Sequence, residues 1–139
     1  MSELIQENCG VGLVWDSSDA VKAVREGLSH RGKDAEGYCT FSNGGINAVR
    51  GYSGLLDEQA LITLLKYEKE NPIAVHTRYK TRGSGQQDAL LLAAHPHTIG
   101  GDDVFQGNHY VTIGAKEAMV HNGTVSFDFS PFDIKTKTD

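Results

Sequence analysis

The chain has 139 residues, of which 39% are hydrophobic and 22% charged, and its formal net charge at pH 7 is −5. This length is enough for one domain with a core, and the acidic balance argues against a nucleic-acid or anionic-membrane surface. Two cysteines are too few for a secreted disulfide framework, and residues 1–8 are too acidic and polar for a secretory signal, so we expect a cytoplasmic protein. The apolar stretches are too short to span a membrane.

The first third of the chain predicts a strand, a helix and a hairpin. Residues 9–15, Cys-Gly-Val-Gly-Leu-Val-Trp, are typical of a buried strand. Asp16 or Ser17 is placed to cap a helix over residues 19–29, where apolar side chains recur at helical spacing. Strands follow at 37–42 and 46–50, joined by the hairpin signal Asn-Gly-Gly.

The rest of the chain predicts one more helix and then mainly strands. Asp57 is placed to cap a helix that runs to Leu65, and Asn-Pro at 71–72 ends it. The strands that we expect afterwards lie at 73–79, 109–114 and 118–121, the last two paired with each other. A turn is expected at 100–103. Strands dominate, so the predicted class is α+β with antiparallel pairing.

Cys9 is the residue whose position most suggests chemistry. One cleavage after residue 8 would make it N-terminal, so that its thiol and its own α-amine would lie on the same residue. An α-amine titrates near pH 8 and can relay protons for a nucleophile at physiological pH. The alternative is an ordinary buried strand cysteine.

Four segments, taken in order, resemble the class II glutamine amidotransferases, which are N-terminal-nucleophile enzymes such as amidophosphoribosyltransferase and glucosamine-6-phosphate synthase. They are Cys-Gly-Val-Gly at 9–12, His-Arg-Gly-Lys-Asp at 30–34, His-Thr-Arg-Tyr-Lys-Thr at 76–81 and His-Asn-Gly at 121–123. The resemblance implies a four-layer αββα sandwich with antiparallel sheets. It also implies a leader at 1–8 and a partial amidotransferase domain over 9–139, truncated at its C-terminus.

The resemblance implies a role for each matching residue in hydrolysis of L-glutamine to glutamate and ammonia. Cys9 would attack the side-chain amide and form a thioester, with Asn122 and Gly123 as the oxyanion hole. The residues that would bind the rest of glutamine are Arg31, Gly32, Arg78, Thr81 and Asp139. Among these, Arg78 would hold the α-carboxylate, a task suited to a planar guanidinium.

The family hands its ammonia to an acceptor domain or subunit, which lies outside this chain. Ala-Ala-His-Pro-His at 93–97 resembles the sugar-aminotransferring branch, whereas Arg-Tyr at 78–79 and the short leader resemble the phosphoribosyl branch. The acceptor therefore stays open. We expect no cofactor, no nucleic-acid or membrane partner, and an oligomer.

Three other interpretations compete with this one. His95 and His97 with His121 or Cys9 could ligate zinc, but no Cys-x-x-Cys or His-Glu-x-x-His spacing occurs, so we expect no metal. If the leader stays attached, the chain would be a non-catalytic glutamine-binding or regulatory module. A third interpretation, an N-terminal-nucleophile hydrolase of another amide, is disfavoured by Arg78 together with Asn-Gly at 122–123.

Overall fold

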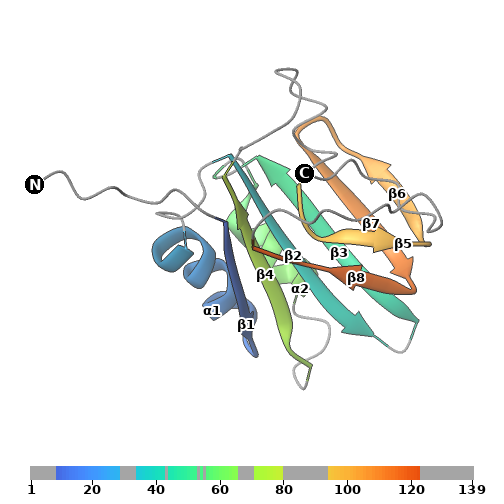
Figure 1. Ribbon diagram of the computed structural model, residues 1–139, viewed down its shortest axis with the longest axis horizontal. Coiled ribbons are helices and arrows are strands. Elements are labelled where there is room, and N and C mark those ends of the chain that lie inside the picture. The colour runs from blue at the N-terminus through green and yellow to red at the C-terminus, as the bar shows by residue number, and fades with distance from the viewer. Residues whose placement is uncertain are drawn as a thin grey trace, which may run out of the picture.

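A six-stranded antiparallel sheet organises the structure, a computed structural model that describes residues 9–28, 34–42, 44–52, 54, 56–65, 71–79 and 94–122. Figure 1 shows the sheet with its strands labelled. In spatial order the strands are β1 (Gly10–Val14), β4 (Ile73–Arg78), β2 (Ala35–Ser42), β3 (Gly45–Tyr52), β7 (His109–Ala115) and β6 (Asp102–Phe105). All strand pairs of this sheet are antiparallel among the described residues.

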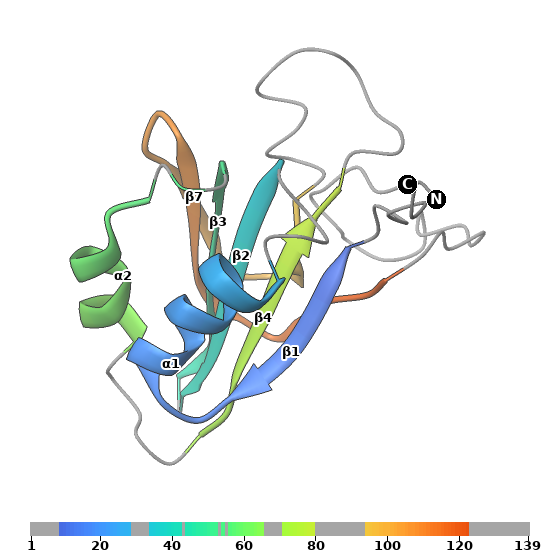
Figure 2. The same cartoon turned by 90° about the vertical axis from the view of Figure 1, so that its left-hand side faces the viewer.

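Three helical segments cover one face of this sheet, as Figure 2 shows for α1 and α2. They are α1 (Ser17–Lys22), its π-helical continuation η1 (Ala23–Leu28) and α2 (Glu58–Leu65). Asp16 caps α1 as predicted, because its carboxylate accepts from the amides of Ser18 at 2.8 Å and Asp19 at 3.2 Å. Asp57 likewise caps α2 by accepting from the amide of Ala60 at 2.7 Å.

The main core lies between these helices and the sheet. Alternate residues along each strand point toward the helices, as the period of a strand requires. The buried members of this core are Ala20, Val21, Val24, Tyr38, Val49, Leu56, Leu61, Leu65, Ile73 and Val75. One ion pair is built into it: Arg25 contacts the fully buried carboxylate of Glu36 at 2.9 Å, and its guanidinium also donates to the carbonyl of Leu56 at 2.6 Å.

A small second sheet packs on the opposite face. It consists of β5 (His97–Ile99) and β8 (Glu117–Met119), and Figure 1 shows both strands crossing in front of the larger sheet. Ala118 and Val120 pack against a second core cluster of Cys39, Ala48 and Ala74. The described residues therefore form three layers, helices, large sheet and small sheet. The four-layer αββα sandwich stays a prediction.

Two expectations about pairing and turns are wrong. The strands expected at 109–114 and 118–121 do not pair with each other: β7 pairs with β3 and β6, and β8 pairs with β5. Only Lys116 separates β7 from β8, which is too short for a hairpin, and its amide donates to the carbonyl of Ile99 at 2.9 Å. The expected turn at 100–103 is confined to two glycines with positive φ, after which β6 begins at Asp102.

The predicted burial of strand 9–15 is also wrong. β1 is an edge strand, and Val11, Leu13 and Trp15 are 41%, 60% and 60% exposed. They point away from the helices, on the face where the small sheet packs over β2, β3 and β4 instead. A hydrophobic run reveals an affinity for an apolar layer, but not whether such a layer covers both of its faces.

Candidate functional site

Two of the predicted site residues, Cys9 and Arg78, lie together at the end of β4. The antiparallel register places Gly10 opposite Thr77, so Cys9, the residue before β1, lies beside Arg78, the last residue of β4. The Sγ of Cys9 lies 3.9 Å from the carbonyl oxygen of Tyr79. Cys9 and Arg78, which are 69 positions apart in the sequence, are thereby neighbours.

Cys9 and Arg78 also share one face of the sheet. Directly paired residues of antiparallel strands point the same way, and Val11, two residues after Cys9, pairs with His76, two residues before Arg78. Neighbouring residues of β4, such as Val75, point toward the helices. The thiol and the guanidinium therefore both belong to the face that carries the small sheet. Cys9 is half-buried, and Arg78 is 3% exposed.

The segment of residues 30–34 joins the same place at its final residue. The amide of Asp34 donates to the carbonyl of Arg78 at 3.0 Å. β2 starts at the next residue, so the pairing of β2 with β4 positions the end of this segment.

The fourth segment, at residues 121–123, follows the small sheet. The ring Nε2 of His76 lies 3.1 Å from the carbonyl oxygen of His121, and a carbonyl can only accept, so this nitrogen donates. That hydrogen bond holds the chain after β8 against β4, with the exposed Asn122 next in sequence. The structure thus brings Cys9, Arg78 and the His121–Asn122 peptide to one end of β4.

The other predicted site residues lie outside the described residues. They are the oxyanion-hole residue Gly123, the substrate-binding residues Arg31, Gly32, Thr81 and Asp139, and the leader at 1–8. Their roles stay predictions.

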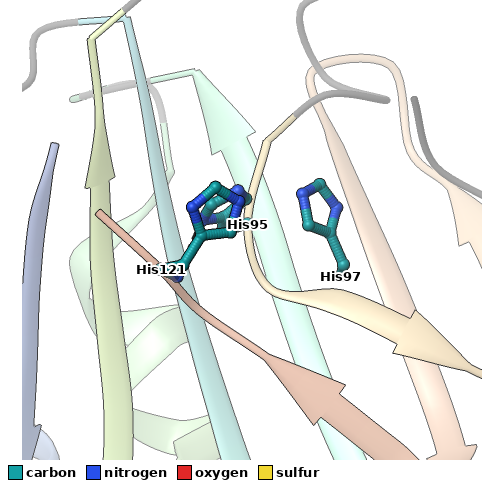
Figure 3. Close-up of side chains that lie close together, drawn as sticks. All are labelled: His95, His97 and His121. Atoms are coloured by element: carbon teal, nitrogen blue, oxygen red, sulfur yellow. Dashed lines mark hydrogen bonds between the residues drawn. The ribbon is translucent and has the colours of Figure 1, made fainter. Parts of the chain in front are cut away.

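A cluster of four histidines lies beside Arg78; the sequence named three of them only as a rival zinc set, and it did not predict that His76 packs with them. We call it the histidine cluster: His76 on β4, His95 and His97 around the start of β5, and His121 after β8. The ring centroid of His95 lies 3.9 Å from that of His76, 4.2 Å from that of His97 and 4.3 Å from that of His121. Figure 3 shows His95 and His121 overlapping in the view and His97 beside them. Only His-Pro-His at 95–97 gave a local signal, because the other two residues arrive from distant strands.

Burial keeps three of these rings, those of His76, His95 and His97, neutral. Desolvation is the main cause that lowers the pKa of His76 to about 4 and that of His97 to about 3, and it also lowers the pKa of His95. Neighbouring positive charge adds to the effect on each ring, including that of Arg78. At neutral pH these imidazoles are therefore uncharged, with one nitrogen lone pair each.

Gly37 and Arg50 hold the His95–Pro96 segment against the sheet. A Cβ on Gly37 would overlap the carbonyl oxygen of His95, so only glycine allows this close approach. The guanidinium of Arg50, which is 1% exposed, donates to the carbonyl of Pro96 at 3.0 Å and approaches the carboxylate of Asp103 at 4.0 Å. Burial lowers the pKa of Arg50, opposed by that carboxylate. The segment is thus packed from beneath and anchored by a buried cation.

The two cysteines differ in their surroundings. Cys39 is buried in the small core cluster, and desolvation raises the pKa of its thiol to about 11. Cys9 is half-buried at the end of β4. Cys9 is the thiol that can serve as a nucleophile, since Cys39 is held as a neutral, enclosed group.

A separate cavity of about 430 Å³ lies between α2 and the strands β3 and β7. It is mostly apolar and is lined among others by Leu56, Leu61 and Val111. These side chains belong to the helix-covered face of the sheet, so this cavity is not part of the site at the end of β4.

The chain matches no family model, no curated protein and no solved structure. Among the described helices, none combines the length and apolar character that crossing a membrane requires.

Proposed function

We propose that this chain is a glutaminase domain of the class II amidotransferase type, hydrolysing L-glutamine to glutamate and ammonia with Cys9 as nucleophile. The observation that carries the proposal is the convergence at the end of β4. Cys9 lies beside Arg78 at the end of β4, and the carbonyl of His121, the residue before Asn122, accepts a hydrogen bond from His76 of the same strand. This approach of three segments that are distant in the sequence supports the proposal.

In this proposal the thiolate of Cys9 attacks the amide carbon of glutamine. The carbonyl electrons move to oxygen, and the oxyanion accepts hydrogen bonds from the side-chain amide of Asn122 and the backbone N–H of Gly123. The C–N bond then breaks, the α-amine of Cys9 passes a proton to the departing nitrogen, and ammonia leaves a thioester. Water attacks the thioester, which releases glutamate and restores the thiol.

The roles of Arg78 and of the leader follow from the same chemistry. Arg78 belongs to the same sheet face as Cys9 and is 3% exposed, so its attraction for the glutamine α-carboxylate would be little screened by water. The α-amine of Cys9 exists only after removal of residues 1–8. The proposal therefore includes cleavage of the bond between Asn8 and Cys9, an acceptor domain or subunit that takes the ammonia, and a cytoplasmic setting that fits two free thiols.

Glutamate release from L-glutamine, measured together with the intact mass of the protein, tests the proposal. A form that begins at Cys9 should be active, and Cys9→Ala should abolish turnover. Asn122→Ala should lower kcat by about 10²- to 10³-fold, and Arg78→Lys should raise KM because a bidentate clamp is lost. Cys39→Ala is the matched thiol control and should keep its activity.

The outcomes separate the proposal from its rival, the non-catalytic module. Turnover that survives Cys9→Ala would overturn the mechanism. A Cys9-initiated chain that binds glutamine in calorimetry but releases no glutamate would instead identify a binding or regulatory module of the same fold.

A further inference from the structure

The histidine cluster has the composition of a transition-metal site. Each of His95, His97 and His121 offers a ligand nitrogen, and these three nitrogens all lie within 4.8 Å of one another. Three nitrogens bound tetrahedrally to one Zn²⁺ at about 2.05 Å would be about 3.4 Å apart. Small rotations of three side chains bridge that difference.

The rings are shielded from water inside the cluster. A metal binds the lone pair of neutral imidazole, and His95 and His97 are both buried. The Nδ1 of His95 accepts a weak hydrogen bond from the amide of His121 at 3.4 Å. Its lone pair therefore points toward His121, into the cluster, where a metal would replace that weak donor.

His76 supplies an independent sign that the cluster lacks a component. It is 1% exposed, and its Nε2 donates to the carbonyl of His121. The tautomer with hydrogen on Nε2 leaves Nδ1 as an acceptor, and this buried atom has no hydrogen-bond partner within the described part of the chain. Its ring packs 3.9 Å from His95. Through its hydrogen bond to His121, His76 acts as the outer support that orients a ligand-bearing segment.

The local charge selects the kind of metal. Positive charge from Arg50 and Arg78 acts on His97, and the cluster contains no carboxylate among the ligand candidates. Hard cations such as Mg²⁺ and Ca²⁺ require oxygen ligands and negative charge, and so would not bind here. Zn²⁺, Co²⁺, Ni²⁺ and Cu²⁺ suit imidazole nitrogen.

We propose that His95, His97 and His121 bind one divalent transition metal of the zinc type, with a fourth position open to water or an anion. The sequence offered this set only as a rival zinc interpretation without a recognised ligand spacing, since His121 is 24 residues from His97. The register of β5 with β8 brings it near, because His97 pairs with Met119, two residues before His121. This site is independent of the glutaminase proposal, since none of its three ligands is assigned a role in that reaction.

Metal binding to the full chain tests the proposal directly. The probe is Co²⁺ added to chelator-treated Cys9→Ser protein, which removes the half-buried thiol as a competing ligand. We expect one equivalent to give the intense visible absorption of a four-coordinate cobalt centre, and Zn²⁺ to displace it in calorimetry. His97→Ala and His121→Ala should each weaken binding by more than about 100-fold, the upper range for loss of an outer-shell partner alone.

His109→Ala is the matched control, because His109 on β7 bonds to Asn108 and lies outside the cluster. The folding of each variant is first checked by circular dichroism. If His97→Ala or His121→Ala fails to fold, it is replaced by His97→Gln or His121→Gln, which keeps a polar side chain of similar length. A parent protein that gives no cobalt absorption and binds no Zn²⁺ would overturn the proposal. Binding that survives the His97 and His121 replacements, or is lost with His109→Ala, would overturn it as well.

Discussion

Gly37→Ala should destabilise the fold and dismantle the site without altering any proposed catalytic residue. Gly37 lies on β2 between His76 and Arg50, its partners in the flanking strands. A Cβ there would overlap the carbonyl oxygen of His95 and would lie 2.7 Å from its carbonyl carbon and 2.9 Å from the Cδ of Pro96. These are backbone and ring atoms, which cannot rotate out of the way.

The magnitude follows from that geometry. Overpacking in a core typically costs about 1–3 kcal/mol, and the upper part of this range applies because the clash is with backbone. Replacing glycine by alanine at an unstrained position would stabilise the fold by about 0.4–1 kcal/mol through the unfolded chain. We therefore expect a net loss of about 1–2.5 kcal/mol in the free energy of unfolding.

Urea unfolding followed by far-ultraviolet circular dichroism measures this change. Gly27→Ala in η1 is the matched control, since a Cβ there meets no atom within 4 Å. The control should be neutral or slightly stabilising, because alanine is the better helix former. Displacement of the His95–Pro96 segment in Gly37→Ala should also weaken cobalt binding. If Gly37→Ala unfolds at the parent's urea concentration and keeps the parent's metal affinity, the segment does not pack on β2 and the description of the site is wrong.

Three further results are expected. Arg25→Met should lower the free energy of unfolding by about 3 kcal/mol, because it leaves the fully buried carboxylate of Glu36 without its cation. Adding Glu36→Gln should recover part of that loss in a double-mutant cycle, whereas equal stabilities of the parent and Arg25→Met would contradict the prediction. Leu65→Ala, at a side chain 3% exposed, should cost about 2–5 kcal/mol in the same urea assay, and a change below 1 kcal/mol would mean that α2 does not pack on the sheet. At pH 8 a thiol reagent should label Cys9 in the folded protein while Cys39 stays unreacted, since a pKa of about 11 leaves roughly one Cys39 thiolate in a thousand, and fast labelling of Cys39 would refute its burial. Because this folded pKa exceeds the ordinary value of 9.0, the stability that burial of the neutral thiol contributes is present below pH 9 and is lost as the pH rises through 11.

Local signals predicted most of the elements correctly because their physical causes are local. The caps at Asp16 and Asp57 depend on a side chain two or three residues from the amides that it accepts from. The hairpin between β2 and β3 depends on the Asn-Gly-Gly turn between two strand-forming runs. The antiparallel α+β class follows from the sum of such signals.

The sequence also predicted which residues to compare, but it could not place them. Cys9, Arg78 and Asn122 were selected by residue type and order, whereas their meeting at the end of β4 depends on two strand registers and one hydrogen bond. A contact between residues 45 or 70 positions apart, such as His76 with His121 or Cys9 with Tyr79, leaves no periodic pattern in the sequence of either segment. This is also why the partners of β7 and β8 were predicted wrongly.

The sequence alone determined most of the elements, the caps and the order of the residues that carry the proposed chemistry, because each of these depends on neighbours along the chain. Only the tertiary structure decided which face of β1 is exposed, which strands pair with each other, and that four histidines pack in one cluster. Burial is a property of the layer that covers a residue, and that layer comes from elsewhere in the chain. The lowered pKa values of His76 and His97, and the proposed metal site of which His97 is a ligand, could therefore arise only once the small sheet had packed on the large one.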